Sequence, residues 1–87
     1  MKRQKIVEKA EEVSNKISFD ELNKKVTVHM TNKGLLTYED ARAFLYEEWI
    51  IVIFGEFKTF LVFREKEIDA FDEESMSSPK KASDILK

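Results

Sequence analysis

Two adjacent apolar segments near the middle of the chain limit its possible folds more than any other part of the sequence. The first is Trp-Ile-Ile-Val-Ile-Phe at 49–54, and the second returns at 57–64 after Gly55-Glu56. β-Branched and aromatic residues in runs of this length favour strands over helices. Glycine in the first central position is typical of a two-residue hairpin turn. We therefore predict an antiparallel β-hairpin over residues 49–64.

The predicted hairpin is apolar on both of its faces. A two-residue turn at Gly55-Glu56 pairs Val52 with Thr59 on one face and Ile51 with Phe60 on the other. A sheet with one wet face alternates apolar and polar residues, and this hairpin does not. Burying one large apolar side chain contributes about 1.5–3 kcal/mol, so leaving either face in water would be costly. Either helices of the same chain cover both faces, or one face meets a second molecule.

The residues before residue 35 predict a helix followed by a strand. Residues Gln4–Ile17 carry a single apolar stripe, which predicts an amphipathic helix. Ser18 and Glu21 form a capping-box pattern, and we expect a short second helical turn through Lys24. Residues Lys25–Thr31 alternate between apolar and polar side chains, as in a half-buried strand, and end at an Asn-Lys-Gly turn.

The remaining segments complete an α+β prediction. Thr37 can cap a second helix over Tyr38–Glu48, whose first turn is acidic. Residues 65–74 fit either a short helix or an extension of the strand. We predict one α+β domain over residues 1–74, with an N-terminal helix, a strand, a helix and an antiparallel hairpin in a sheet of about three strands. Residues 75–87 are Ser- and Lys-rich and predict a flexible tail.

Length and composition indicate the number of domains and the cellular compartment. The chain has 87 residues, which suits one domain. It has no cysteine, which excludes disulfides and thiolate metal sites and favours a reducing compartment. No apolar run approaches the roughly 20 residues that cross a bilayer, and none follows Lys2 and Arg3 as in a secretory signal. We expect a soluble cytoplasmic protein without a membrane partner.

Charge is distributed unevenly along the chain. Residues 37–75 carry eleven Asp/Glu and four Lys/Arg, a net charge of −7, whereas residues 1–34 and 76–87 are net positive at +3 and +2. An acidic centre repels phosphate, so we do not expect the folded part to bind nucleic acid. The basic ends, with Ser-Pro-Lys-Lys at 78–81, leave a small nucleic-acid-binding accessory protein as the alternative.

The sequence shows no catalytic or cofactor-binding pattern. His29 is the single histidine and is expected on the polar side of its strand, with no nucleophile or acid in a recognisable motif. Two glycines, Gly34 and Gly55, are too few for phosphate-binding loops. The acidic cluster at 69–74 lacks the ligand spacing of a calcium loop. We predict no enzyme activity, no cofactor and no metal.

The function that these patterns favour is a non-enzymatic protein-binding module. Frequent lysine and isoleucine hint at an AT-rich bacterial or phage genome, so we expect a small regulator or inhibitor of a larger bacterial protein, of the phage or mobile-element type. Its partner is another protein, a second copy of the chain in a homodimer, or both. Docking is expected through the edge or a face of the hairpin, with acidic residues steering the partner. The predicted docking residues are Ile50, Val52, Phe54, Phe57, Leu61, Glu47, Glu48, Glu65, Glu67, Asp69, Asp72 and Glu73.

Overall fold

The apolar stripe near the N-terminus forms helix α1 (Arg3–Lys16), which confirms the first predicted element. The computed structural model describes residues 2–75. Ile6, Ala10 and Ser14 are buried one turn apart on a single face of α1. The helix ends before Ser18, whose backbone N–H donates to the Glu21 carboxylate at 2.9 Å in the predicted capping box. This box opens a short 3-10 turn, η1 (Phe19–Glu21), that leads into the sheet.

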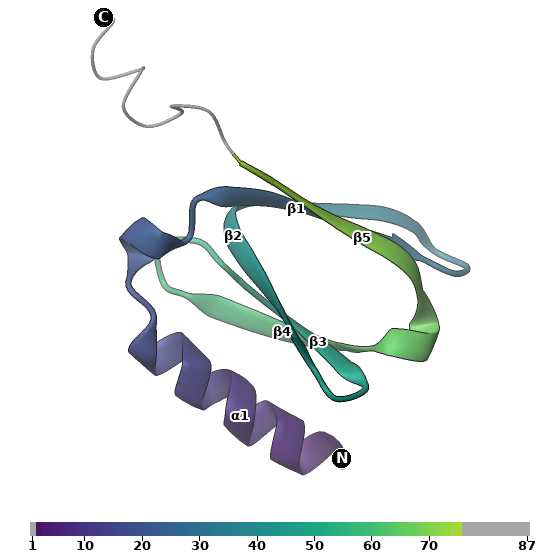
Figure 1. Ribbon diagram of the computed structural model, residues 1–87, viewed down its shortest axis with the longest axis horizontal. Coiled ribbons are helices and arrows are strands. Elements are labelled where there is room, and N and C mark those ends of the chain that lie inside the picture. Colours follow the sequence, from purple (N-terminus) through teal and green to yellow (C-terminus); the bar gives the residue numbers. More distant parts are fainter. Residues whose placement is uncertain (1, 76–87) are drawn as a thin grey trace, which may run out of the picture.

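A five-stranded antiparallel sheet follows the helix, instead of the predicted sheet of about three strands. The strands are β1 (Lys24–Met30), β2 (Gly34–Tyr46), β3 (Trp49–Phe54), β4 (Thr59–Arg64) and β5 (Ile68–Ser75), with a 3-10 turn η2 (Glu65–Glu67) before β5. Their spatial order is β4-β3-β2-β1-β5, so β4 and β5 are the two edges of the sheet. After β4 the chain crosses to the opposite edge, where β5 pairs with β1 (Figure 1).

The predicted helix over Tyr38–Glu48 is wrong, because these residues belong to β2. Asp40 has a positive φ of 52°, and the pairing of β2 with β1 shifts at the same place, as in a β-bulge. The bulge moves the inward-facing positions by one residue, so Tyr38 and Ala41 pack in the same cluster. A spacing of three residues then resembles a helical stripe although the backbone is extended. β2 thus pairs with β1 through its first part and with β3 through its second.

The hairpin β3–β4 is confirmed, but its turn is longer than predicted. The turn spans residues 55–58, with Gly55 at φ 84° and Lys58 at φ 54°. Val52 pairs with Leu61 instead of Thr59, a shift of two positions. Side chains in a strand alternate between faces with a period of two, so this shift leaves every predicted face unchanged.

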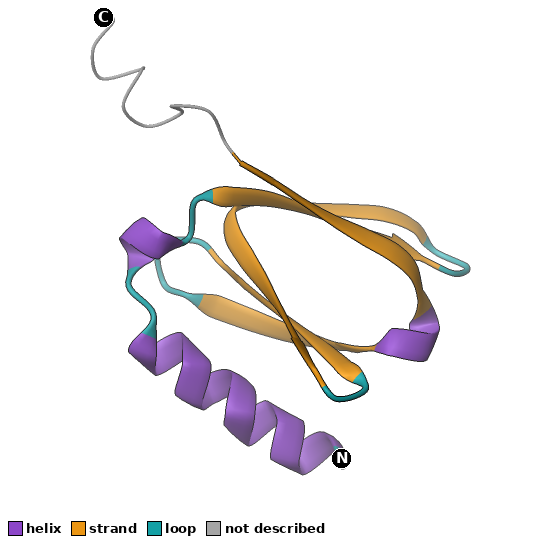
Figure 2. Cartoon of the chain, viewed as in Figure 1, coloured by secondary structure: helices purple, strands orange, loops and turns teal. Residues whose placement is uncertain are grey.

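Each face of the hairpin packs in its own hydrophobic cluster, and within residues 2–75 a helix covers just one of the two faces. On the outer face, Trp49, Ile51 and Ile53 pack against Ile6 and Ala10 of α1. Figure 2 shows α1 along one side of the curled sheet. On the inner face, the sheet curls over itself, and β3 packs against residues of β1, β2 and β5. That inner cluster centres on Val26, Val28, Ala41, Ile50 and Val52.

The structure decides between the two predictions for residues 65–74 and describes one residue of the predicted tail. Of the two readings for residues 65–74, the strand holds for most of the segment, because β5 begins at Ile68 after the single turn η2. Ser75 ends β5, and the rest of the predicted tail, 76–87, lies outside the described residues. Between residues 2 and 75, no helix is long and apolar enough to span a membrane.

Candidate docking surface at the β4 edge

Strand β4 has β3 as its single strand neighbour in the described sheet, and α1 packs against one of its faces. The Glu65 N–H donates to the Glu48 carbonyl at 2.8 Å, which fixes the alternation of hydrogen bonds along the pair. In an antiparallel pair, every second residue bonds to the neighbouring strand and the residues between them point away. The N–H and C=O groups of Phe60, Val62 and Arg64 therefore point away from β3. This row can accept an added strand.

The two sheet edges are protected to different degrees. Natural edge strands are kept from pairing by charged residues, proline, bulges or short length. β5 carries four carboxylates among its eight residues. β4 has six residues, Thr-Phe-Leu-Val-Phe-Arg, and its first five contain no charge, proline or glycine. Its pairing with β3 is regular, without a bulge. Of the two edges of the sheet, β4 is therefore the one open to a partner.

Exposed apolar side chains adjoin this edge. Phe57, in the turn before β4, is 87% exposed, and Leu61 in β4 is 37% exposed. Single exposed apolar residues are common and carry little meaning alone. Beside an unprotected strand edge, however, they supply apolar surface that an added strand would cover. On the other face of β4, Phe60 and Val62 pack against the cluster under α1.

The structure places the predicted apolar docking residues in two groups. Ile50 and Val52 are 2% and 0% exposed, so in this fold they belong to the core and offer nothing to a partner. Phe54 is half-buried, with its ring 4.9 Å from that of Tyr38. Phe57 and Leu61 remain accessible. Sequence reasoning did not find the outward backbone of β4, because a strand becomes an edge through its neighbours in space.

The predicted acidic residues also separate by environment. Glu47 and Glu48 lie in the β2–β3 turn, and the bond between Glu48 and Glu65 shows that this turn and η2 lie at the same end of the hairpin. Glu67 follows in η2. These four carboxylates lie at that end of the sheet together with the basic side chains of Arg64 and Lys66.

Along β5, carboxylates hold the chain together. The Glu73 carboxylate accepts hydrogen bonds from the Ala43 backbone N–H at 2.8 Å and from the Arg42 Nε at 3.3 Å. Asp69 accepts from the Thr31 hydroxyl at 3.0 Å. Asp72 lies 3.5 Å from the His29 Nε2. Glu73 thus ties β5 to the far part of β2, a structural role that the sequence did not indicate.

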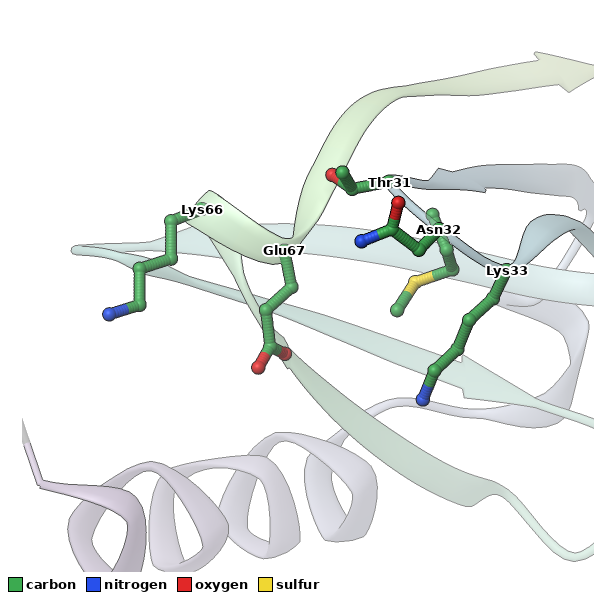
Figure 3. Close-up of a pocket in the computed structure, with 6 residues that line it drawn as sticks. Thr31, Asn32, Lys33, Lys66 and Glu67 are labelled. Atoms are coloured by element: carbon green, nitrogen blue, oxygen red, sulfur yellow. The ribbon is translucent and has the colours of Figure 1, made fainter.

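Two shallow hollows lie near η2. One, of about 390 Å³, is lined by Glu48, Arg64, Glu65 and Lys66. The other, of about 280 Å³, lies between the β1–β2 turn and η2, and Figure 3 shows the Lys66 side chain extending away from that turn. Apart from Met30, the lining residues are exposed and carry polar or charged side chains, whereas small-molecule pockets are lined mainly by apolar and aromatic residues.

Metal-binding geometry is not found in the part of the chain that the structure describes. No group of three or more His, Asp or Glu side chains between residues 2 and 75 is arranged to hold a metal ion. His29 is partly exposed on β1, and its recorded ionic neighbour is Asp72.

In comparisons with known proteins, no family model, no curated protein and no solved structure matches this chain significantly.

Proposed function

We propose that this chain is a non-enzymatic protein-binding module that acts as a small regulator or inhibitor of a larger protein. One observation carries the proposal: the β4 edge is regular, apolar and unprotected, whereas the opposite edge of the same sheet carries four carboxylates. Exposed edges of this kind pair with extended segments of other chains. Retaining one is costly for solubility, so we infer that it serves binding.

The mechanism is the addition of a strand to β4. Backbone groups of Phe60, Val62 and Arg64 supply hydrogen bonds to an extended segment of the partner. Phe57 and Leu61 supply the apolar contact beside it. The acidic surface around Glu48 and η2 lies at one end of β4 and would orient a basic region of the partner.

Photocrosslinking tests the position of this interface. A benzophenone amino acid in place of Phe57 should give a discrete adduct with a partner protein in cells. The same group in place of Leu35, an exposed apolar position at the start of β2, is the control and should not give that adduct. Equal adducts from both positions, or none from position 57, would contradict the proposal.

A second pair of variants tests whether the backbone edge is required. Arg64 has a φ of −79°, which proline can adopt, and its N–H points away from β3. Arg64→Pro should therefore preserve the hairpin and remove the Phe57 adduct, because proline lacks a donor and blocks close approach of a strand. Arg64→Lys keeps both the N–H and the charge and should retain the adduct. An adduct that survives Arg64→Pro would show that binding does not use the edge.

A further inference from the structure

The turn between β3 and β4 contains a strained residue that contacts helix α1. Lys58 has a φ of 54°, in the left-handed region that residues other than glycine rarely adopt. Its ammonium group donates a hydrogen bond to the Ile17 carbonyl at 3.2 Å, and its own carbonyl accepts one from the Ser14 hydroxyl at 2.8 Å. Glycine would adopt this backbone conformation without strain, but it has no side chain to reach α1. Lysine at this position therefore connects the turn to the helix.

These two bonds join the turn to the C-terminal part of α1. Ile17 is the C-cap of the helix, at the end where the helix dipole is negative and the backbone carbonyls attract a cation. Ser14 is 7% exposed, so its hydroxyl is shielded from water and would be costly to leave without a partner. Lys58 itself is half-buried. The contacts with α1 therefore restrict where the end of the turn can lie.

The turn is also bonded to the sheet. The Gly55 N–H donates to the Asp40 carbonyl in the bulge of β2 at 3.0 Å, and the Lys58 N–H donates to the Gly55 carbonyl at 3.0 Å. The first and last residues of the turn are thus both held by hydrogen bonds. Phe57 lies between them and is 87% exposed. An exposed aromatic side chain is therefore carried by a turn whose backbone is tied to the sheet on one side and to α1 on the other.

We propose that Phe57 is an aromatic anchor that enters an apolar pocket of the partner protein, and that α1 holds it in position through Lys58. The proposal rests on the proposed function, because it assigns roles to residues of the same interface. Binding is tighter when an anchor is fixed beforehand, because less conformational entropy is lost on association. A mobile turn would populate the binding conformation part of the time, and the affinity would fall by that fraction. Lys58 and Ser14 are thus positioning residues, which act on the partner through Phe57.

Backbone amide relaxation, measured by NMR on the free chain, tests the positioning. The order parameter of the Phe57 N–H should be about 0.85 in the wild type, as in rigid backbone. Lys58→Met keeps the aliphatic stem and removes the ammonium donor, and combined with Ser14→Ala it removes both bonds to α1. In this double variant the order parameter should fall below about 0.6, as in flexible backbone. Lys58→Arg keeps a donor and should keep the turn rigid, and so should Lys66→Met, a control at an exposed lysine of η2.

The midpoint of urea denaturation separates positioning from a purely structural role. A double variant with a lower urea midpoint but an unchanged Phe57 order parameter would show that the two bonds stabilise the fold without fixing the anchor, and the proposal would be wrong. A wild-type order parameter already below about 0.6 would overturn it as well. Lys58→Met alone serves if the double variant does not fold, and the order parameter should fall there too.

The photocrosslink at position 57 measures the consequence for binding. With the benzophenone group at this position, the double variant should give a roughly tenfold lower yield of the partner adduct, the loss expected if the bound conformation is populated about a tenth of the time. Lys58→Arg should retain the yield. An unchanged yield from a mobile turn would overturn the proposal and leave the proposed function intact. Absence of the adduct in the wild-type background would instead refute the proposed function, so the two failures are distinguishable.

Discussion

Both faces of the β3–β4 hairpin are buried within a single copy of the chain. We therefore predict that two isoleucines on opposite faces of β3 contribute equally to the free energy of unfolding. Ile53 lies under α1 and Ile50 lies inside the curl of the sheet, with exposed fractions of 0% and 2%. Ile53→Ala and Ile50→Ala each remove roughly three buried carbon groups at ~0.8 kcal/mol apiece. With the cavity term, each should lower the free energy of unfolding by about 3 kcal/mol, within the 2–5 kcal/mol typical of such changes.

Urea denaturation followed by Trp49 fluorescence and far-UV circular dichroism measures this cost. A chain of 87 residues has a free energy of unfolding of roughly 4–13 kcal/mol. With a urea dependence of about 1.5 kcal/mol per molar, each alanine variant should lose about 2 M in its midpoint. Ile50→Val and Ile53→Val, at about 0.5–1.5 kcal/mol, serve if an alanine variant does not fold. Leu35→Ala, at a 61% exposed position, is the control and should cost less than about 0.5 kcal/mol.

Clearly unequal losses in the free energy of unfolding for Ile50→Ala and Ile53→Ala would refute the reasoning. If Ile53→Ala costs about 3 kcal/mol and Ile50→Ala costs no more than Leu35→Ala, the inner face is open in a single copy. The same conclusion would follow if the cost of Ile50→Ala appears only at high protein concentration, because a second copy would then supply the cover.

Three further predictions concern individual contacts. Glu73→Ala should lower the free energy of unfolding by about 1 kcal/mol, because it removes two partly exposed hydrogen bonds to β2, whereas Glu74→Ala should be close to neutral by urea denaturation. Burial raises the pKa of Tyr38, so in a Tyr46→Phe background its absorbance titration should lie above the ordinary value of 10.0. The contribution of the protonated Tyr38 to the free energy of unfolding should then be fully present below pH 10 and be lost as the pH rises above it, because the unfolded chain releases this proton first. A Tyr38 titration at or below 10.0 would contradict this expectation. Gly55→Ala, at φ 84° with open space around the Cβ position, should cost about 1–2 kcal/mol through backbone strain alone, and a neutral thermal melt would count against that turn geometry.

Local patterns of the sequence determined several elements correctly. The apolar stripe of α1, the Ser18–Glu21 capping box, the alternation of β1 and the apolar run of β3 each depend on neighbours within about seven residues. Side-chain period and capping chemistry are sufficient for such elements. The apolar composition of both hairpin faces was also readable, because a two-residue error in the turn cannot change which face a side chain occupies.

Tertiary structure alone decided the rest. The bulge at Asp40 gave β2 a three-residue spacing that imitates a helix, and only pairing with β1 and β3 on its two sides made that segment a strand. The inner face of the hairpin is buried because the sheet curls and β5 returns to β1, a contact between residues about 40 to 50 positions apart. The same long-range pairing left β4 as an edge strand without charged residues in its first five positions. A local pattern could not indicate this, because a strand is an edge when no other strand pairs beside it.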